Sequence, residues 1–134
     1  MSGRPEQLAE TARRWVGLAS DDLRVARCAL GLADPPYWLV AYHLQQAVEK
    51  SLKAVLVRRG VGFPLTHDIS LLLDLCAEHL PESRGWRGAV RLSNYGTQGR
   101  YPGIAETVGE NEVGQVLGIA TEIVETIASR MGQE

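Results

Sequence analysis

Apolar residues recur at intervals of three and four positions along most of this chain, the spacing that places side chains on one side of an α-helix. The pattern predicts five helical segments, over about 5–32, 37–59, 68–79, 81–94 and 111–131. No stretch alternates apolar and polar residues as a β-strand does. Long helices joined by short connections pack as bundles. We therefore expect an all-α fold, an up-and-down bundle of four to five helices, with residues 1–134 forming a single domain.

The residues between these segments indicate where each helix stops. Pro35 and Pro36 end the first helix, because proline has no amide donor and disfavours a helical residue before it. Gly60 follows the second helix and is expected to close it in the left-handed conformation. The amino end of the third helix has three candidate capping residues, Thr66, His67 and Asp68.

Composition excludes several classes of function. The formal net charge of −2 gives no general attraction to nucleic acid or to an anionic membrane, so any anion must be bound by a local cluster. No apolar run approaches the roughly 20 residues that span a bilayer, and the first residues lack the hydrophobic core of a signal peptide. We expect a cytoplasmic location. Cys28, Cys76 and the three histidines show no metal-ligand spacing, so we expect neither a metal nor a cofactor, and a buried Cys76.

The segment 43–54 carries a dense set of polar side chains beside an apolar stripe, Gln45, Gln46, Glu49, Lys50 and Lys53. Glu49 precedes Lys53 by four residues, the favourable order for a surface ion pair of about 0.3–0.5 kcal/mol. One interpretation is therefore the polar surface of a helix. The other is a binding surface, because amide and ammonium groups suit a protein partner, a neighbouring subunit or a nucleotide.

Two shorter motifs accompany this segment. His67 lies at the amino end of the third helix, where capping is favoured over anion binding because Asp68 would oppose a phosphate. Tyr95 and then Arg100-Tyr101-Pro102 lie in a glycine-rich connection over about 95–109. Arg100 either meets a phosphate or ties the connection to Glu49 or to a carbonyl group. Lys50, Lys53 and Arg100 are expected to converge on one patch that binds an anionic ligand.

In their order and spacing, these motifs resemble the HEPN domain family. The resemblance implies a helical module that binds nucleotides and that is often encoded beside, or fused to, a minimal nucleotidyltransferase in a two-component, toxin–antitoxin-like system. It also implies that the segment 100–102 lies near the glutamine-rich helix. The ligand-binding or partner-binding residues that we expect are Gln45, Gln46, Glu49, Lys50, Lys53, His67, Tyr95, Arg100 and Tyr101.

The catalytic motif of HEPN ribonucleases, Arg-x4–6-His, is missing from the sequence. Arg58 and Arg59 precede His67 by eight and seven intervening residues, which is too far. We therefore expect no catalytic residue and a non-catalytic module. Two alternatives stay open. The first is a ribonuclease or toxin with a degenerate motif, which would use His43 or His67 together with a basic residue of a second subunit. The second is a purely structural protein. Long apolar faces of the first and last helices, together with Trp15, Trp38 and Trp86, predict a homodimer.

Overall fold

The computed structural model describes residues 3–96, 102–103 and 105–133. Its elements are α1 (Pro5–Leu30), α2 (Tyr37–Arg58), α3 (Ile69–Cys76) and α4 (Glu110–Gln133), with the 3₁₀-helices η1 (Pro81–Gly85), η2 (Arg87–Tyr95) and η4 (Ala105–Thr107). These described parts of the chain contain no strand. The predicted all-α helical bundle is confirmed.

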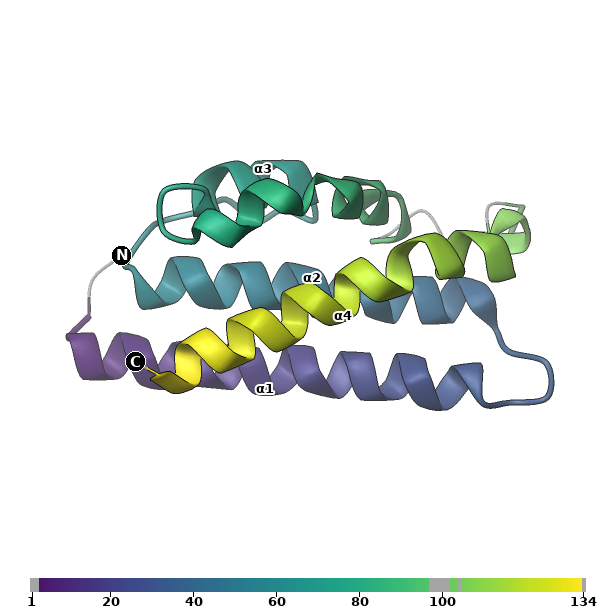
Figure 1. The fold of residues 1–134 in the computed structure, drawn as a ribbon, viewed down its shortest axis with the longest axis horizontal. Coiled ribbons are helices and arrows are strands. Elements are labelled where there is room, and N and C mark those ends of the chain that lie inside the picture. The colour runs from purple at the N-terminus through teal and green to yellow at the C-terminus, as the bar shows by residue number, and fades with distance from the viewer. Residues whose placement is uncertain (1–2, 97–101, 104, 134) are drawn as a thin grey trace.

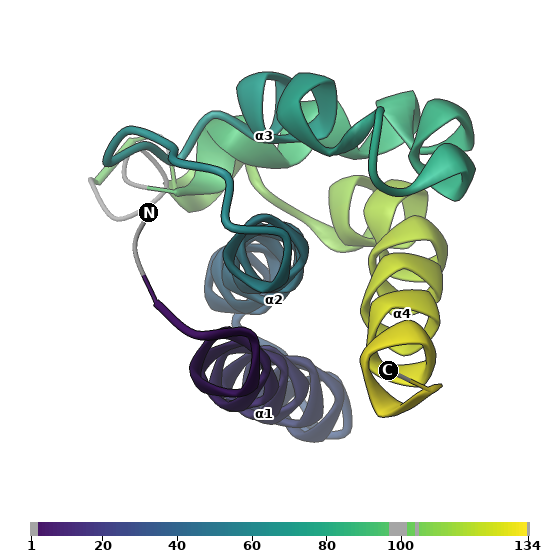
Figure 2. The same ribbon diagram turned by 90° about the vertical axis from the view of Figure 1, so that its left-hand side faces the viewer.

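Helix α2 lies at the centre of the bundle. Helices α1 and α2 run antiparallel as a hairpin, α4 crosses beside them, and α3 with η1 and η2 covers a further side of α2 (Figures 1 and 2). As a result, α2 buries residues around most of its circumference over its carboxyl-terminal half, from Ser51 to Val57 without interruption. Four polar residues of α2 are therefore placed inside the fold rather than on an outer face, namely Gln45, Glu49, Ser51 and Lys53.

The ends of α2 and α3 follow the expected chemistry. Gly60 has a φ of 69°, and its amide donates to the carbonyl of Val57 (3.1 Å) while the amide of Val61 donates to Leu56 (2.9 Å). These two bonds close α2 in a Schellman motif, as Gly60 predicted. At the start of α3, the Asp68 carboxylate accepts hydrogen bonds from the amides of residues 70 and 71, so Asp68 is the cap.

The segment predicted as helical over 81–94 is helical, but it forms the two 3₁₀-helices η1 and η2 rather than one α-helix. Trp86, Ala89 and Leu92 are spaced by three residues and are all at most 2% exposed. A 3₁₀-helix has three residues per turn, so it turns all three side chains to the core. The Trp86 indole also donates to the Glu122 carboxylate of α4 at 2.7 Å.

No helix among the described residues is both long and apolar enough to cross a membrane. Within the same residues, no group of three or more His, Cys, Asp and Glu side chains could hold a metal ion. Cys76 is fully buried as expected, and burial raises the pKa of its thiol to about 12, so the thiol stays protonated.

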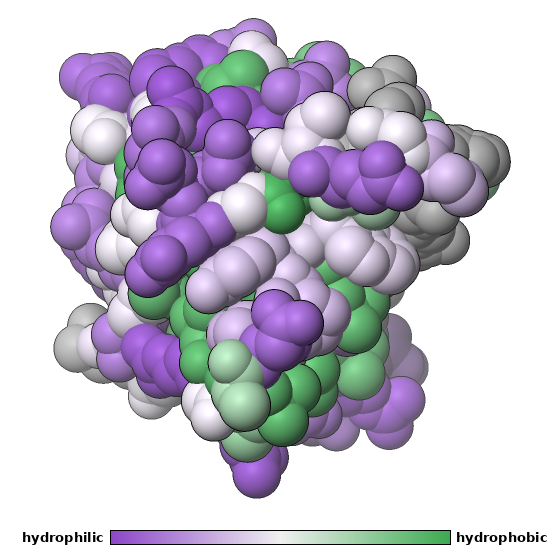
Figure 3. All heavy atoms as spheres, turned by 90° about the vertical axis from the view of Figure 1, so that its right-hand side faces the viewer, coloured by the Kyte–Doolittle hydropathy of each residue, from purple (hydrophilic) through white to green (hydrophobic). Residues whose placement is uncertain are grey.

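Apolar side chains gather on the end of the molecule where α1 turns into α2 (Figure 3). Leu32, in that turn, is 58% exposed. A depression of about 240 Å³ is lined there by Leu30 and Tyr37 of the hairpin and by Val113 and Leu117 of α4. This depression is mainly apolar and lies apart from the polar residues of α2 described next.

Candidate functional site

Three polar residues of α2, each four positions from the next, form one buried row. Gln45, Glu49 and Lys53 are 0%, 4% and 7% exposed. A spacing of four aligns them on one side of the helix. Because an isolated buried charge is costly, such a row requires partners inside the protein.

Glu49 is the centre of a hydrogen-bonded network. Its Oε1 accepts from Gln45 Nε2 at 2.8 Å and from His67 Nδ1 at 2.7 Å, and its Oε2 accepts from Lys53 Nζ at 2.9 Å. Gln46 Nε2 donates to Gln45 Oε1 at 2.7 Å. We call these five residues, Gln45, Gln46, Glu49, Lys53 and His67, the Glu49 network.

The network keeps Glu49 ionised. Burial raises the pKa of Glu49, but hydrogen bonds from Lys53, Gln45 and His67, together with the Lys53 charge, outweigh burial and hold that pKa below 4.5. An ionised carboxylate only accepts hydrogen bonds. His67 Nδ1 must therefore carry the hydrogen that it shares with Glu49, and Nε2 is the ring nitrogen that Glu49 leaves unused.

Aromatic rings and a close backbone approach surround the network. Lys53 Nζ lies 5.9 Å from the ring centre of Trp15 and 5.7 Å from that of Phe63, within the range of cation–π attraction. A Cβ atom added to Gly96 would lie 3.0 Å from the Cβ of His67. The end of η2 can thus pack on His67 because residue 96 has no side chain.

A second polar cluster joins α1 to α2 on another side of α2. The Asp22 carboxylate accepts from His43 Nδ1 at 2.9 Å and from Lys50 Nζ at 2.7 Å. All three side chains are partly buried. Lys50 is therefore engaged with α1 and does not converge with Lys53, contrary to the expectation of a shared cationic patch.

The structure thus brings together five of the nine residues predicted for the site, namely the members of the Glu49 network. Tyr95 lies at the end of η2, and burial together with nearby Glu112 raises its pKa above 10. Arg100 and Tyr101 lie outside the described residues. The predicted pair of Glu49 with Lys53 forms, but inside the protein rather than on its surface, and His67 contacts Glu49 while Asp68 supplies the cap.

Sequence reasoning missed the partners that other segments supply. Asp22 had a detectable signal, because it interrupts a row of Trp15, Leu18 and Val25 at spacings of three and four, and a carboxylate in such a row needs a partner. Trp15, Phe63 and Gly96 carried no comparable signal, because their contacts with the network depend on tertiary packing.

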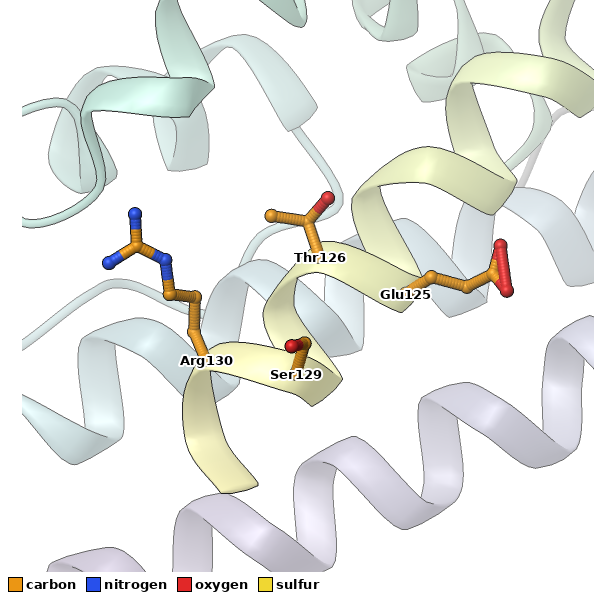
Figure 4. A pocket seen from close by; sticks show the side chains of 4 residues that line it. All are labelled: Glu125, Thr126, Ser129 and Arg130. Atoms are coloured by element: carbon orange, nitrogen blue, oxygen red, sulfur yellow. The ribbon is translucent and has the colours of Figure 1, made fainter. Parts of the chain in front are cut away.

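A shallow depression of about 360 Å³ on the outer side of α4 is a weaker candidate site. Its lining side chains, Glu125, Thr126, Ser129 and Arg130, come from one helix and spread apart rather than converging on a common point (Figure 4). Arg130 is also paired with Glu82 of η1 at 2.5 Å. The Glu49 network, which joins two segments and reaches the surface at His67, is the better candidate.

Comparison with known proteins agrees with the fold and with the motifs. The HEPN domain family matches residues 12–131. The crystal structure of TT1696 from Thermus thermophilus is similar, with 31% sequence identity, a TM-score of 0.69, and coverage of 90% of this chain and 97% of that one. No curated protein matches the chain. From the helical bundle, the motifs of α2 and the match over residues 12–131, this chain belongs to the HEPN domain family.

Proposed function

We propose that this chain is a non-catalytic, single-domain HEPN protein of the cytoplasm that forms a homodimer and binds a nucleotide or a protein partner. A minimal nucleotidyltransferase, encoded beside it in a toxin–antitoxin-like system, is the partner that the family resemblance suggests. In such a pair the nucleotidyltransferase performs the chemistry, and this chain supplies binding.

The Glu49 network is the observation that supports a binding role. Burying an ion pair gains little stability relative to apolar residues of similar volume, so the network is a costly way to fill a core. It does, however, fix the position of two groups that reach the surface. The side chain of His67 is 52% exposed, and Gln46 is partly exposed beside Gln45. These groups can offer hydrogen bonds to a ligand from a rigid base.

A nucleotide-binding measurement on the purified protein tests this proposal. Isothermal titration calorimetry with ATP, GTP and AMP should detect binding, and adding the product of a neighbouring nucleotidyltransferase gene should show complex formation. Gln46→Ala should weaken binding, whereas Arg24→Ala, which removes an exposed pair with Asp21 on α1, should not. Absence of both nucleotide binding and complex formation would contradict the proposal.

The contact between Glu49 and His67 also favours a second candidate, the ribonuclease with a degenerate motif. A carboxylate that orients an imidazole is an arrangement used in general acid–base catalysis. The missing Arg-x4–6-His motif argues against this candidate, so we expect no cleavage when the protein is incubated with structured or single-stranded RNA. Cleavage that His67→Ala or His43→Ala abolishes would instead support the enzyme.

A further inference from the structure

We propose that His67, in its protonated form, is the residue that contacts the anionic group of the ligand, through Nε2, so that ligand binding weakens as the pH rises. This inference rests on the proposed function, because it assigns the charge and the atom that make a nucleotide phosphate bind at the Glu49 network. The other cations of α2 in this region are Lys50 and Lys53.

Both lysines of the expected anion site are already paired with carboxylates. Lys53 is 7% exposed and donates to Glu49. Lys50 donates to Asp22 of α1. The formal charges of Glu49 and Lys53 cancel, so the network attracts an anion only when a further positive charge is added. Within the network, the imidazole of His67 is the group that can add it.

The orientation of the ring makes this charge available at the surface. Nδ1 is held by Glu49 at 2.7 Å, while 52% of the side chain is exposed. In the neutral ring Nε2 is an acceptor, and its lone pair repels a phosphate oxygen. Protonation converts Nε2 into a charged donor, and charge-assisted hydrogen bonds to phosphate are strong. Histidine is the side chain that ordinarily changes charge between about pH 5 and 8.

Among the described residues, the other titratable groups around His67 are Glu49, Lys53, Asp68 and Tyr95. Glu49 is ionised, because its pKa lies below 4.5, and Lys53 forms its ion pair. The Asp68 carboxylate, whose charge alone would oppose a phosphate, accepts hydrogen bonds from the amides at the start of α3, and the partial positive charge of those amides offsets it. On η2, which reaches His67 through Gly96, Tyr95 stays uncharged because burial, aided by Glu112, raises its pKa above 10. The comparison with His67→Asn therefore decides whether a change in anion binding over this range comes from His67.

The test is calorimetry with ATP and with sulfate at about pH 6 and about pH 8, where histidine changes charge. Sulfate serves as a second probe because it keeps its charge throughout and has no base or sugar. The matched variant is His67→Asn, whose amide nitrogen replaces Nδ1 as the donor to Glu49 but which has nothing at the position of Nε2. Circular dichroism at both pH values confirms that each protein is folded.

For the wild type, we expect the affinity for both probes to fall on the order of tenfold from the lower to the higher pH, the loss of one charge-assisted hydrogen bond. His67→Asn should bind both probes weakly, and with equal affinity at the two pH values.

If the wild type binds ATP equally well at both pH values, or if His67→Asn keeps the pH profile, the assignment to His67 is wrong while the proposed function stands. If the wild type binds neither probe at either pH, the assignment fails, and nucleotide binding fails with it. Binding of ATP without sulfate would show that the base or sugar supplies the affinity, and would also overturn the assignment.

Discussion

At the scale of single residues, the burial of Glu49 and Lys53 decides how each will respond to mutation. Lys53→Met keeps most of the side-chain volume but leaves the Glu49 carboxylate buried without its cation. Removing one partner of a buried ion pair costs about 3–5 kcal/mol. We expect Lys53→Met to lower the free energy of unfolding by about that amount, measured by urea denaturation followed by circular dichroism.

Lys50→Met is the matched control on the same helix. Lys50 pairs with Asp22, but 24% of the lysine side chain is exposed, so water can compensate for the loss. The expected cost is about 1 kcal/mol or less. Equal losses for Lys53→Met and Lys50→Met would contradict the view that the Glu49 network is the buried, more strongly coupled cluster.

The ionisation of Glu49 also predicts how stability depends on pH. Its pKa is below 4.5 in the folded protein, so folding favours the ionised form. The resulting stabilisation is complete above the unfolded pKa, about 4.5, and is lost as the pH falls through the lower folded value. The difference in unfolding free energy between wild type and Glu49→Gln should therefore shrink on acidification from about pH 5 towards pH 3. A difference that stays constant or grows would show that Glu49 is not stabilised as an anion.

At the scale of elements, α2 presents two polar rows to two different neighbours. Residues 45, 49 and 53 face His67 and the end of η2, and residues 43 and 50 face Asp22 of α1. At 3.6 residues per turn, the two rows lie about a third of a turn apart. The sequence identifies the polar residues of α2, but it does not show which neighbour covers each row. For this reason the sequence predicts one patch for Lys50 and Lys53, although they belong to two clusters.

Gly96 tests whether the contact of η2 with the network holds His67 in place. Its φ of −65° suits any residue, so a methyl group there acts only through space. The added Cβ of Gly96→Ala would lie 3.0 Å from the Cβ of His67 and 3.4 Å from the Gln45 side chain. Overpacking of this kind costs about 1–3 kcal/mol. We expect that loss in urea denaturation, with a shift of the His67 imidazole signals in NMR spectra.

Gly85→Ala in η1 is the control for this steric effect. A Cβ at Gly85 meets nothing within 4 Å. The free energy of unfolding of Gly85→Ala should stay within about 0.5 kcal/mol of the wild-type value, as for other surface changes. The His67 signals in its NMR spectra should not shift. If Gly96→Ala behaves in the same way, the end of η2 does not hold His67 against Glu49.

At the scale of the whole molecule, the periodicity of apolar residues was sufficient to predict the bundle and the four α-helices that the described residues form. The spacing of 86, 89 and 92 was less informative, because positions three apart suit both an α-helix and a 3₁₀-helix. The site was predicted where its residues lie on one helix, as Gln45, Glu49 and Lys53 do. It was missed where Trp15, Phe63 and Gly96 approach from other segments, since no local pattern encodes those contacts.

The predicted homodimer needs a surface that a single chain leaves uncovered, and α1 offers one. Leu18 and Val25 are 51% and 46% exposed and lie seven residues apart, on the same side of the helix. Trp15 and Trp38 are also partly exposed, whereas Trp86 is buried and does not contribute, contrary to the sequence-based expectation. Exposed apolar side chains in a row are typical of a surface that a second copy covers.

We therefore expect light scattering at micromolar concentration to give the mass of a dimer for the wild type and of a monomer for Leu18→Glu with Val25→Glu. The two carboxylates would lie desolvated within the interface, which opposes association, but they would be exposed in the free chain and leave its helix content unchanged. Leu65→Glu is the control, because Leu65 is fully exposed in the connection before α3 and far from this row in the sequence. A monomeric wild type would contradict the dimer itself. A double variant that remains dimeric would instead place the interface on another face, such as the apolar end formed by α4 and the turn between α1 and α2.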